Sequence, residues 1–116
     1  DARACLAEAG TPLSTAGVIG GGSRSAFWTR ILANVLDLPL VRYRGADKGP
    51  AFGAARLARL ATGHGSLAEI CRVPPVQDVV APEPALVEAY QPRIAAYRRL
   101  YAVLKPEFSP GDHGRD

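Results

Sequence analysis

The 116-residue sequence contains two cysteines, no methionine and no long apolar run. Cys5 and Cys71 are too isolated to form a disulfide framework or a metal-binding CxxC set. Each lies at an apolar position of a predicted helix, where a buried, reduced thiol is expected. No stretch reaches the roughly 18 apolar residues that a membrane-spanning helix needs, and no signal-peptide pattern is present. These absences predict a cytoplasmic protein that has no membrane partner.

The sequence also lacks a basic patch and a set of metal ligands. Lysine and arginine number 14 against 11 acidic residues, and their only local concentration is at Arg93, Arg98 and Arg99. This pattern is typical of a solvated helix face, so nucleic acid is not expected as a partner. His, Cys, Asp and Glu do not gather at metal-ligand spacing, and no residue of the chain is predicted to ligate a metal.

The most informative segment is glycine-rich and reads Ala-Gly-Val-Ile-Gly-Gly-Gly-Ser-Arg-Ser at residues 16–25. The apolar pair Val18 and Ile19 predicts a short buried strand, and an amphipathic helix follows the three glycines directly. Glycine has no Cβ and lets the backbone approach a ligand closely, while the next helix directs free N–H groups to the same place. The segment is typical of loops that contact a phosphate or an adenine ring.

The rest of the chain alternates between helix and strand patterns. Helices are predicted at 2–9, from Ser23 or Ser25 to Leu36, at 51–61, at 66–71 and from about residue 84 onward, and strands at 15–19 and 38–43. Residues 73–84 are proline-rich and are predicted to be an extended surface connection. Pro92 interrupts the apolar stripe of the last helix, so a kink or a helix start near Gln91 is expected.

Strands that alternate with helices predict an α/β architecture. Two strands are too few for a stable sheet, and the chain begins inside a helical pattern, so we expect it to be a segment of a larger enzyme. The predicted helix at 51–61 has one side of small residues, namely Gly53, Ala54, Ala55 and Ala58. This side is predicted to pack closely against a neighbouring element.

Two common nucleotide motifs fit the glycine loop poorly. A dinucleotide-binding Gly-x-Gly-x-x-Gly/Ala motif would end at position 25, which is Ser25, and would need an acidic residue at the end of the next strand. A phosphate-binding P-loop would need Gly-Lys-Ser/Thr where Ser23-Arg24-Ser25 stands. The loop therefore predicts nucleotide contact without fitting either motif.

No general base stands out. His64 lies in a Gly-His-Gly turn and His113 lies in the C-terminal tail, and both are predicted to face solvent. Asp47 is the loop carboxylate best placed to act as a base. The favoured interpretation, however, is that Asp47 is a turn residue whose side chain hydrogen-bonds its own backbone. The chain therefore has a candidate binding loop and no predicted catalytic residue.

Three segments in this order resemble the C-terminal part of FGGY-family carbohydrate kinases. They are the glycine loop with its helix at 18–28, the Gly-Pro-Ala-Phe-Gly-Ala-Ala-Arg-Leu-Ala helix at 49–58, and the Tyr-Arg helix near the C-terminus. Within the family, Tyr90-Gln-Pro-Arg93 and Tyr97-Arg-Arg-Leu-Tyr101 are most similar to the branch that phosphorylates D-xylulose. The resemblance spans roughly residues 1–106.

The resemblance implies the C-terminal portion of an actin-like, ribonuclease-H-like ATPase domain over residues 1–106, with a terminal helix from about residue 84 and a disordered tail at 107–116. In such kinases the glycine loop and the first turn of the next helix flank the adenine and ribose of ATP. By position, Gly20 would shape the loop, and Gly21, Gly22, Ser23 and Ala26 would contact the nucleotide. A neutral loop without a lysine suits the adenosine end of ATP.

The activity that the resemblance implies is transfer of the γ-phosphate of ATP to D-xylulose, which gives D-xylulose 5-phosphate. The family's catalytic aspartate, its phosphate-binding turns and most Mg²⁺ contacts belong to upstream segments, and the sugar binds the N-terminal domain. The chain alone is therefore expected to be inactive. ATP, ADP and the sugar are the expected partners, and assembly as a homodimer is left open.

Three alternatives stay open at this point. The chain could belong to another FGGY kinase that acts on ribulose, gluconate or glycerol, to a non-catalytic module that packs on a partner domain, or to a dinucleotide-dependent dehydrogenase. Two places depart from the family pattern. The common Gln-x-x-Ala-Asp of the helix appears as Arg30-Ile-Leu-Ala33-Asn34, and Ala26 stands where several relatives carry a polar residue.

Overall fold

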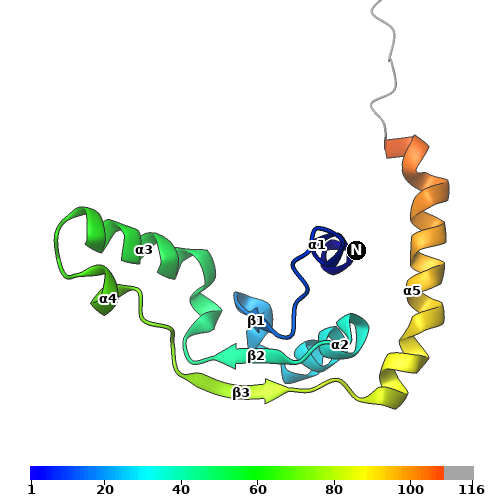
Figure 1. The fold of residues 1–116 in the computed structure, drawn as a ribbon, viewed down its shortest axis with the longest axis horizontal. Coiled ribbons are helices and arrows are strands. Elements are labelled where there is room, and N and C mark those ends of the chain that lie inside the picture. The colour runs from blue at the N-terminus through cyan, green and yellow to red at the C-terminus, as the bar shows by residue number, and fades with distance from the viewer. Residues whose placement is uncertain (109–116) are drawn as a thin grey trace, which may run out of the picture.

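The computed structural model describes residues 1–108 and has an α/β fold (Figure 1). The elements in chain order, with η denoting a 3-10 helix, are α1 (Ala2–Glu8), β1 (Ala16–Val18), η1 (Gly21–Arg24), α2 (Ala26–Leu36), β2 (Leu40–Tyr43), η2 (Ala46–Lys48), α3 (Gly49–Ala61), α4 (Leu67–Ile70), β3 (Val76–Val80), α5 (Pro84–Leu104) and η3 (Lys105–Phe108). Residues 107 and 108 of the predicted tail belong to η3, and the rest of that tail lies outside the described residues.

The strands form one three-stranded sheet in the order β1-β2-β3. β1 runs parallel to β2, with Ala16 opposite Leu40, and β2 runs antiparallel to β3, with Leu40 opposite Val80. Because β1 and β2 are parallel, their carboxyl ends lie at the same edge of the sheet. The glycine loop follows β1 and the η2 turn follows β2, so this topology brings the two loops together.

The prediction that residues 73–84 form only an extended connection was wrong, because this segment contains β3. The four prolines that suggested a loop all lie outside the strand; they are Pro74, Pro75, Pro82 and Pro84. β3 pairs with β2 alone and is an edge strand, where proline at the flanks is tolerated. Val76, Val79 and Val80 lie between these prolines, and pairing with β2 makes this stretch a strand.

Local sequence signals fix several helix ends as predicted. The Ser25 hydroxyl accepts a hydrogen bond of 3.1 Å from the Trp28 backbone N–H and caps α2, which ends at Asp37 in a left-handed conformation with φ of 47°. Ser66 and Glu69 form a capping box at the start of α4. The terminal helix begins at Pro84, as predicted, and runs through Pro92, so the alternative of a helix start near Gln91 was wrong.

The core is small and lies between α2 and the sheet. Its fully buried members are Ala33, Leu38 and Leu40, and the partly buried side chains that pack on them are Ala16, Val18, Leu32, Leu36 and Val80. The radius of gyration is 19.2 Å, whereas a compact domain of this length has about 13 Å. The chain is thus open in shape, and α5 projects away from the sheet (Figure 1).

Much apolar surface is therefore exposed. α3 buries none of its residues, and a Cβ added at Gly53 would meet nothing within 4 Å, so the close packing predicted for its small side is not made within residues 1–108. Cys5 and Cys71 are also exposed, which contradicts the prediction that they are buried, because α1 buries no residue and Cys71 follows the last turn of α4. Among the described helices, even the longest, α5, is too polar to cross a lipid bilayer.

Candidate nucleotide-binding site

The glycine loop leaves β1 and folds back on itself within four residues. Gly20 has a φ of 84°, which only glycine adopts without strain, and its backbone N–H donates a 2.8 Å hydrogen bond to the Ala46 carbonyl. The Gly20 carbonyl accepts two hydrogen bonds from Ser23, one from the backbone N–H at 3.0 Å and one from the hydroxyl at 2.7 Å. Ser23 is 8% exposed, so its side chain serves the shape of the loop.

The middle of the loop is open. A Cβ added at Gly21 would meet nothing within 4 Å, and within residues 1–108 the backbone N–H groups of Gly21 and Gly22 have no hydrogen-bond acceptor. At Gly22 an added Cβ would lie 3.3 Å from Cδ1 of Trp28, so the indole ring lines one side of the loop. This open, uncharged cradle with two free N–H groups fits a flat polar ligand such as a nucleoside.

The first turn of α2 forms the next part of the site. Ala26 is its first residue and is exposed, and Ser25 before it uses its hydroxyl for the helix cap. Phe27 and Trp28 follow, with 72% and 48% of their surfaces exposed. Apolar side chains beside a glycine loop are typical of an adenine pocket wall, in which only a few polar groups fix the ligand.

The η2 loop lies directly against the glycine loop. Gly49, with a φ of 52°, approaches so closely that a Cβ there would lie 3.3 Å from the Gly20 Cα. The Arg24 guanidinium, at the end of η1, donates to one Asp47 carboxylate oxygen at 2.7 Å from Nη2 and 3.1 Å from Nε. These hydrogen bonds lower the pKa of the Asp47 carboxyl below its usual value. Asp47 is therefore an ion-pair partner in addition to a turn residue.

The described part of the candidate site has no free carboxylate or imidazole for proton transfer. The Asp47 carboxylate is engaged by Arg24, and the exposed His64 pairs with the Thr62 hydroxyl in a turn beyond α3. His113 lies outside the described residues. In residues 1–108 no three His, Cys, Asp or Glu side chains lie together as a metal site. The arrangement suits nucleotide contact without a catalytic base.

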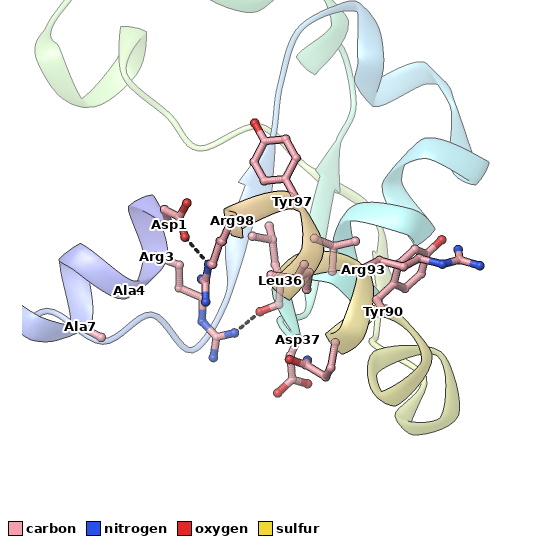
Figure 2. Close-up of a pocket in the computed structure, with 13 residues that line it drawn as sticks. Asp1, Arg3, Ala4, Ala7, Leu36, Asp37, Tyr90, Arg93, Tyr97 and Arg98 are labelled. Carbon is pink, nitrogen blue, oxygen red and sulfur yellow. Dashed lines mark hydrogen bonds and ion pairs between the residues drawn. The ribbon is translucent and has the colours of Figure 1, made fainter. Parts of the chain in front are cut away.

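Two cavities among the described residues do not include the centre of the glycine loop. One has a volume of about 670 Å³ and lies between α1, the end of α2 and α5. Its lining residues are drawn in Figure 2. Its polar groups pair with each other, since Arg98 Nε lies 2.7 Å from the Asp1 carboxylate and Arg3 donates to the Leu36 carbonyl. The other, about 360 Å³, lies between the η2 loop, α3 and residues 71–74, and touches the glycine loop only at Ile19.

The structure thus brings all five predicted site residues to one loop and helix start. Gly20 and Ser23 shape the loop, whereas Gly21, Gly22 and Ala26 face outward or border Trp28. Sequence reasoning missed the contacts from Arg24 and the η2 loop. A signal was available, because opposite charges in the loops after two neighbouring parallel strands are placed at one edge of the sheet.

Comparisons with known proteins identify the family of the chain. Residues 1–62, just over half of the chain, match the family described as "FGGY family of carbohydrate kinases, C-terminal domain". The xylulose kinase of Escherichia coli K12 is 42% identical over 90 residues, which cover 77% of this chain and 19% of that protein. The chain therefore spans about a fifth of the length of this relative.

Solved structures give the same result. A crystal structure described as a xyloylose kinase from Brucella ovis superposes with a TM-score of 0.69 at 35% identity, over 90% of this chain and 22% of that one. A gluconate kinase from Lactobacillus acidophilus superposes with a TM-score of 0.62 at 28% identity, over 83% of this chain and 20% of that one. The predicted fold class is confirmed, and the chain belongs to the FGGY family of carbohydrate kinases, as part of its C-terminal domain.

Proposed function

We propose that this chain is the nucleotide-binding C-terminal part of an ATP-dependent xylulose kinase. The full-length enzyme transfers the γ-phosphate of ATP to D-xylulose and releases ADP and D-xylulose 5-phosphate. The observation that carries the proposal is the 42% identity to a xylulose kinase along 77% of the chain. The open glycine loop supports the nucleotide role.

In this proposal, Gly20, Gly21, Gly22, Ser23 and Ala26 form the wall of the site against adenine and ribose. Gly21 leaves open space for the ligand, and Gly22 and Trp28 border it. ATP supplies the transferred phosphoryl group, and Mg²⁺ neutralises charge on its phosphates. Ligands for Mg²⁺ and the base that acts on the sugar hydroxyl would come from upstream residues of the full-length enzyme.

A substrate comparison on the full-length protein tests the assignment. With saturating ATP and Mg²⁺, ADP release is measured with D-xylulose, ribulose, gluconate and glycerol. The proposal expects kcat/KM to be highest for D-xylulose. A higher value for another substrate would overturn the assignment of the sugar and leave the assignment as a kinase standing. The gluconate kinase neighbour makes gluconate the strongest competitor.

The purified 116-residue chain provides the second test. We expect it to have no kinase turnover, because its described residues offer no free base beside the loop. Turnover by this chain would overturn that part of the proposal. If the full-length protein also lacks ATP-dependent activity, a non-catalytic packing module becomes the better explanation, and concentration-dependent self-association in sedimentation would support it.

The proposed reaction uses ATP and a free sugar, so we place the enzyme in the cytoplasm. Whether it works as a homodimer is left to measurement. Sedimentation of the full-length protein, with and without ATP, would decide the oligomeric state.

A further inference from the structure

Three contacts join residues 46–49, which we call the η2 loop, to the glycine loop. They involve Gly20 at the start of the glycine loop and Arg24 near its end. At the start, the Gly20 N–H donates to the Ala46 carbonyl at 2.8 Å, and a Cβ added at Gly49, the residue after η2, would lie 3.3 Å from the Gly20 Cα. At the end, Arg24 donates two hydrogen bonds to the Asp47 carboxylate. Between these ends, Gly21 and Gly22 are open.

We infer that Asp47 is a positioning residue for nucleotide binding, because it holds Arg24 and thereby fixes the glycine loop in its binding shape. This inference rests on the proposed ATP site. Asp47 sits in the loop after β2, and the hydrogen bonds of its carboxylate among residues 1–108 come from Arg24. Its effect on the glycine loop would therefore be transmitted through Arg24.

We call the Arg24–Asp47 pair the clamp, because it is the contact between the two loops that a side-chain substitution can remove. The backbone contact at Gly20 fixes only the first residue of the loop, and the 3-10 turn Gly21–Arg24 extends beyond it. Without the Asp47 carboxylate, the Arg24 side chain has no other hydrogen-bond partner among residues 1–108, and the end of the turn is held by the 3.2 Å bond from the Ser25 N–H to the Gly22 carbonyl and by the contacts of Ser25 with α2. A loop that must be ordered on binding costs affinity, whereas a preordered loop does not.

The ion pair itself is solvent-exposed on the arginine side, with 74% of the Arg24 side chain and 29% of the Asp47 side chain accessible. Exposed ion pairs add little to global stability. Loss of the pair should therefore leave the fold intact and reduce the order of the glycine loop. This separation between folding and loop order makes the inference testable by substitution.

The test uses the full-length protein with Asp47→Ala, Arg24→Ala and the double variant. We expect the KM for ATP to rise about fivefold, equivalent to about 1 kcal/mol, while the KM for the sugar stays within about twofold. Because the two residues act through each other, the double variant should resemble either single variant. Asp47→Glu, which keeps the charge, should recover part of the loss.

Glu83→Ala is the matched control, because it removes another exposed arginine–carboxylate pair, with Arg30, which joins α2 to the residue before α5 and includes no residue of the glycine loop. It should leave the KM for ATP unchanged. A second readout is amide hydrogen exchange without nucleotide, which should speed up at residues 21–24 in Asp47→Ala and not in Glu83→Ala.

The outcomes separate the two proposals. A wild-type enzyme without ATP-dependent activity overturns the proposed function, and the clamp inference with it. An active wild type whose KM for ATP and loop exchange are unchanged by Asp47→Ala overturns the clamp alone. Fully additive effects of the two substitutions would also overturn it, since independent residues add.

Discussion

The side-chain carbonyl of Asn34 on α2 accepts a 2.6 Å hydrogen bond from the backbone N–H of Glu83, the residue before α5. The Asn34 amide also donates to the Arg30 carbonyl at 2.9 Å, and Arg30 binds the Glu83 carboxylate at 2.5 and 2.8 Å. Asn34 is 1% exposed. This accounts for the departure at positions 30 and 34, because a carboxylate at 34 could accept from Glu83 but could not donate to Arg30.

Asn34→Ala should loosen the junction between α2 and α5. The substitution leaves the Glu83 N–H without its acceptor, a loss of about 1–3 kcal/mol for a buried polar group. Hydrogen exchange at the first turn of α5 in the full-length protein would measure this as faster exchange. Asn34→Asp keeps the acceptor and should lose less, and the exposed Gln91→Ala is the control. Equal protection in Asn34→Ala and wild type would refute the junction role.

Gly21→Ala should weaken ATP binding without weakening the fold. A Cβ at this position meets nothing within 4 Å of the protein, so the methyl group enters only space that the ligand would use. We expect the KM for ATP to rise about tenfold, equivalent to about 1.4 kcal/mol, with an unchanged melting temperature. Steady-state kinetics and a thermal melt of the full-length protein check both parts.

Gly22→Val serves as a comparison for Gly21→Ala, because its side chain would contact the protein as well as the ligand space. Its Cβ would lie 3.3 Å from Trp28, so the indole ring must move, and we expect both ATP affinity and the melting temperature to fall. If Gly21→Ala left the KM for ATP at its wild-type value, the ligand would not lie against the centre of the loop.

The sequence predicted elements whose cause is local. The helices at 26–36, 49–61 and 67–70 were expected close to these positions. Their starts depend on neighbours within a few residues, because Ser25 caps α2, Pro50 lies in the first turn of α3 and a Ser66 capping box begins α4. The glycine loop was found for the same reason. β3 was missed because flanking prolines mark a loop, whereas pairing with β2 is a long-range interaction.

The errors in burial also have a long-range cause. Apolar or small residues at helical spacing indicate a face that packs on something, but they do not indicate which element covers it. Cys5, Cys71 and the small side of α3 are exposed because residues 1–108 provide no covering element for them. The Arg24–Asp47 pair was missed because 23 positions separate the two residues, and only the parallel β1–β2 pairing brings them together.

Asp78 should stabilise the sheet at neutral pH and lose this effect in acid. Arg42 on β2, with 12% of its side chain exposed, donates hydrogen bonds to Asp78 on β3 and lowers the pKa of that carboxyl. A carboxyl whose pKa is lower in the folded state than in the unfolded state stabilises the fold at any pH above its unfolded pKa, which is about 3.9. This contribution to stability is lost as the pH falls through the folded pKa.

Asp78→Asn should therefore melt at a lower temperature than wild type at pH 7, with the difference shrinking below about pH 4. Melts of the full-length protein across this range would measure it, with the exposed Glu88→Gln as a control. A difference that stayed constant with pH would mean that charge on Asp78 does not contribute.

The isolated 116-residue chain should bind hydrophobic dyes and self-associate. Many large apolar side chains are exposed, including Phe27, Leu57, Tyr97 and Val103 at 72%, 68%, 68% and 74%. Exposed apolar patches of this kind mark surfaces that another element or chain covers. Dye fluorescence should be higher per mole for the chain than for the full-length protein, and equal, low fluorescence from both would contradict this.

Photolabelling of the full-length protein with 8-azido-ATP tests the central claim, that the glycine loop and the start of α2 form the adenosine site. Trypsin cleaves after Arg3, Arg24 and Arg30, so residues 4–24 and 25–30 are released as separate peptides. The account predicts label in one or both, removed by excess ATP. ATP-protected label found only in peptides outside residues 4–30, in an active enzyme, would contradict it.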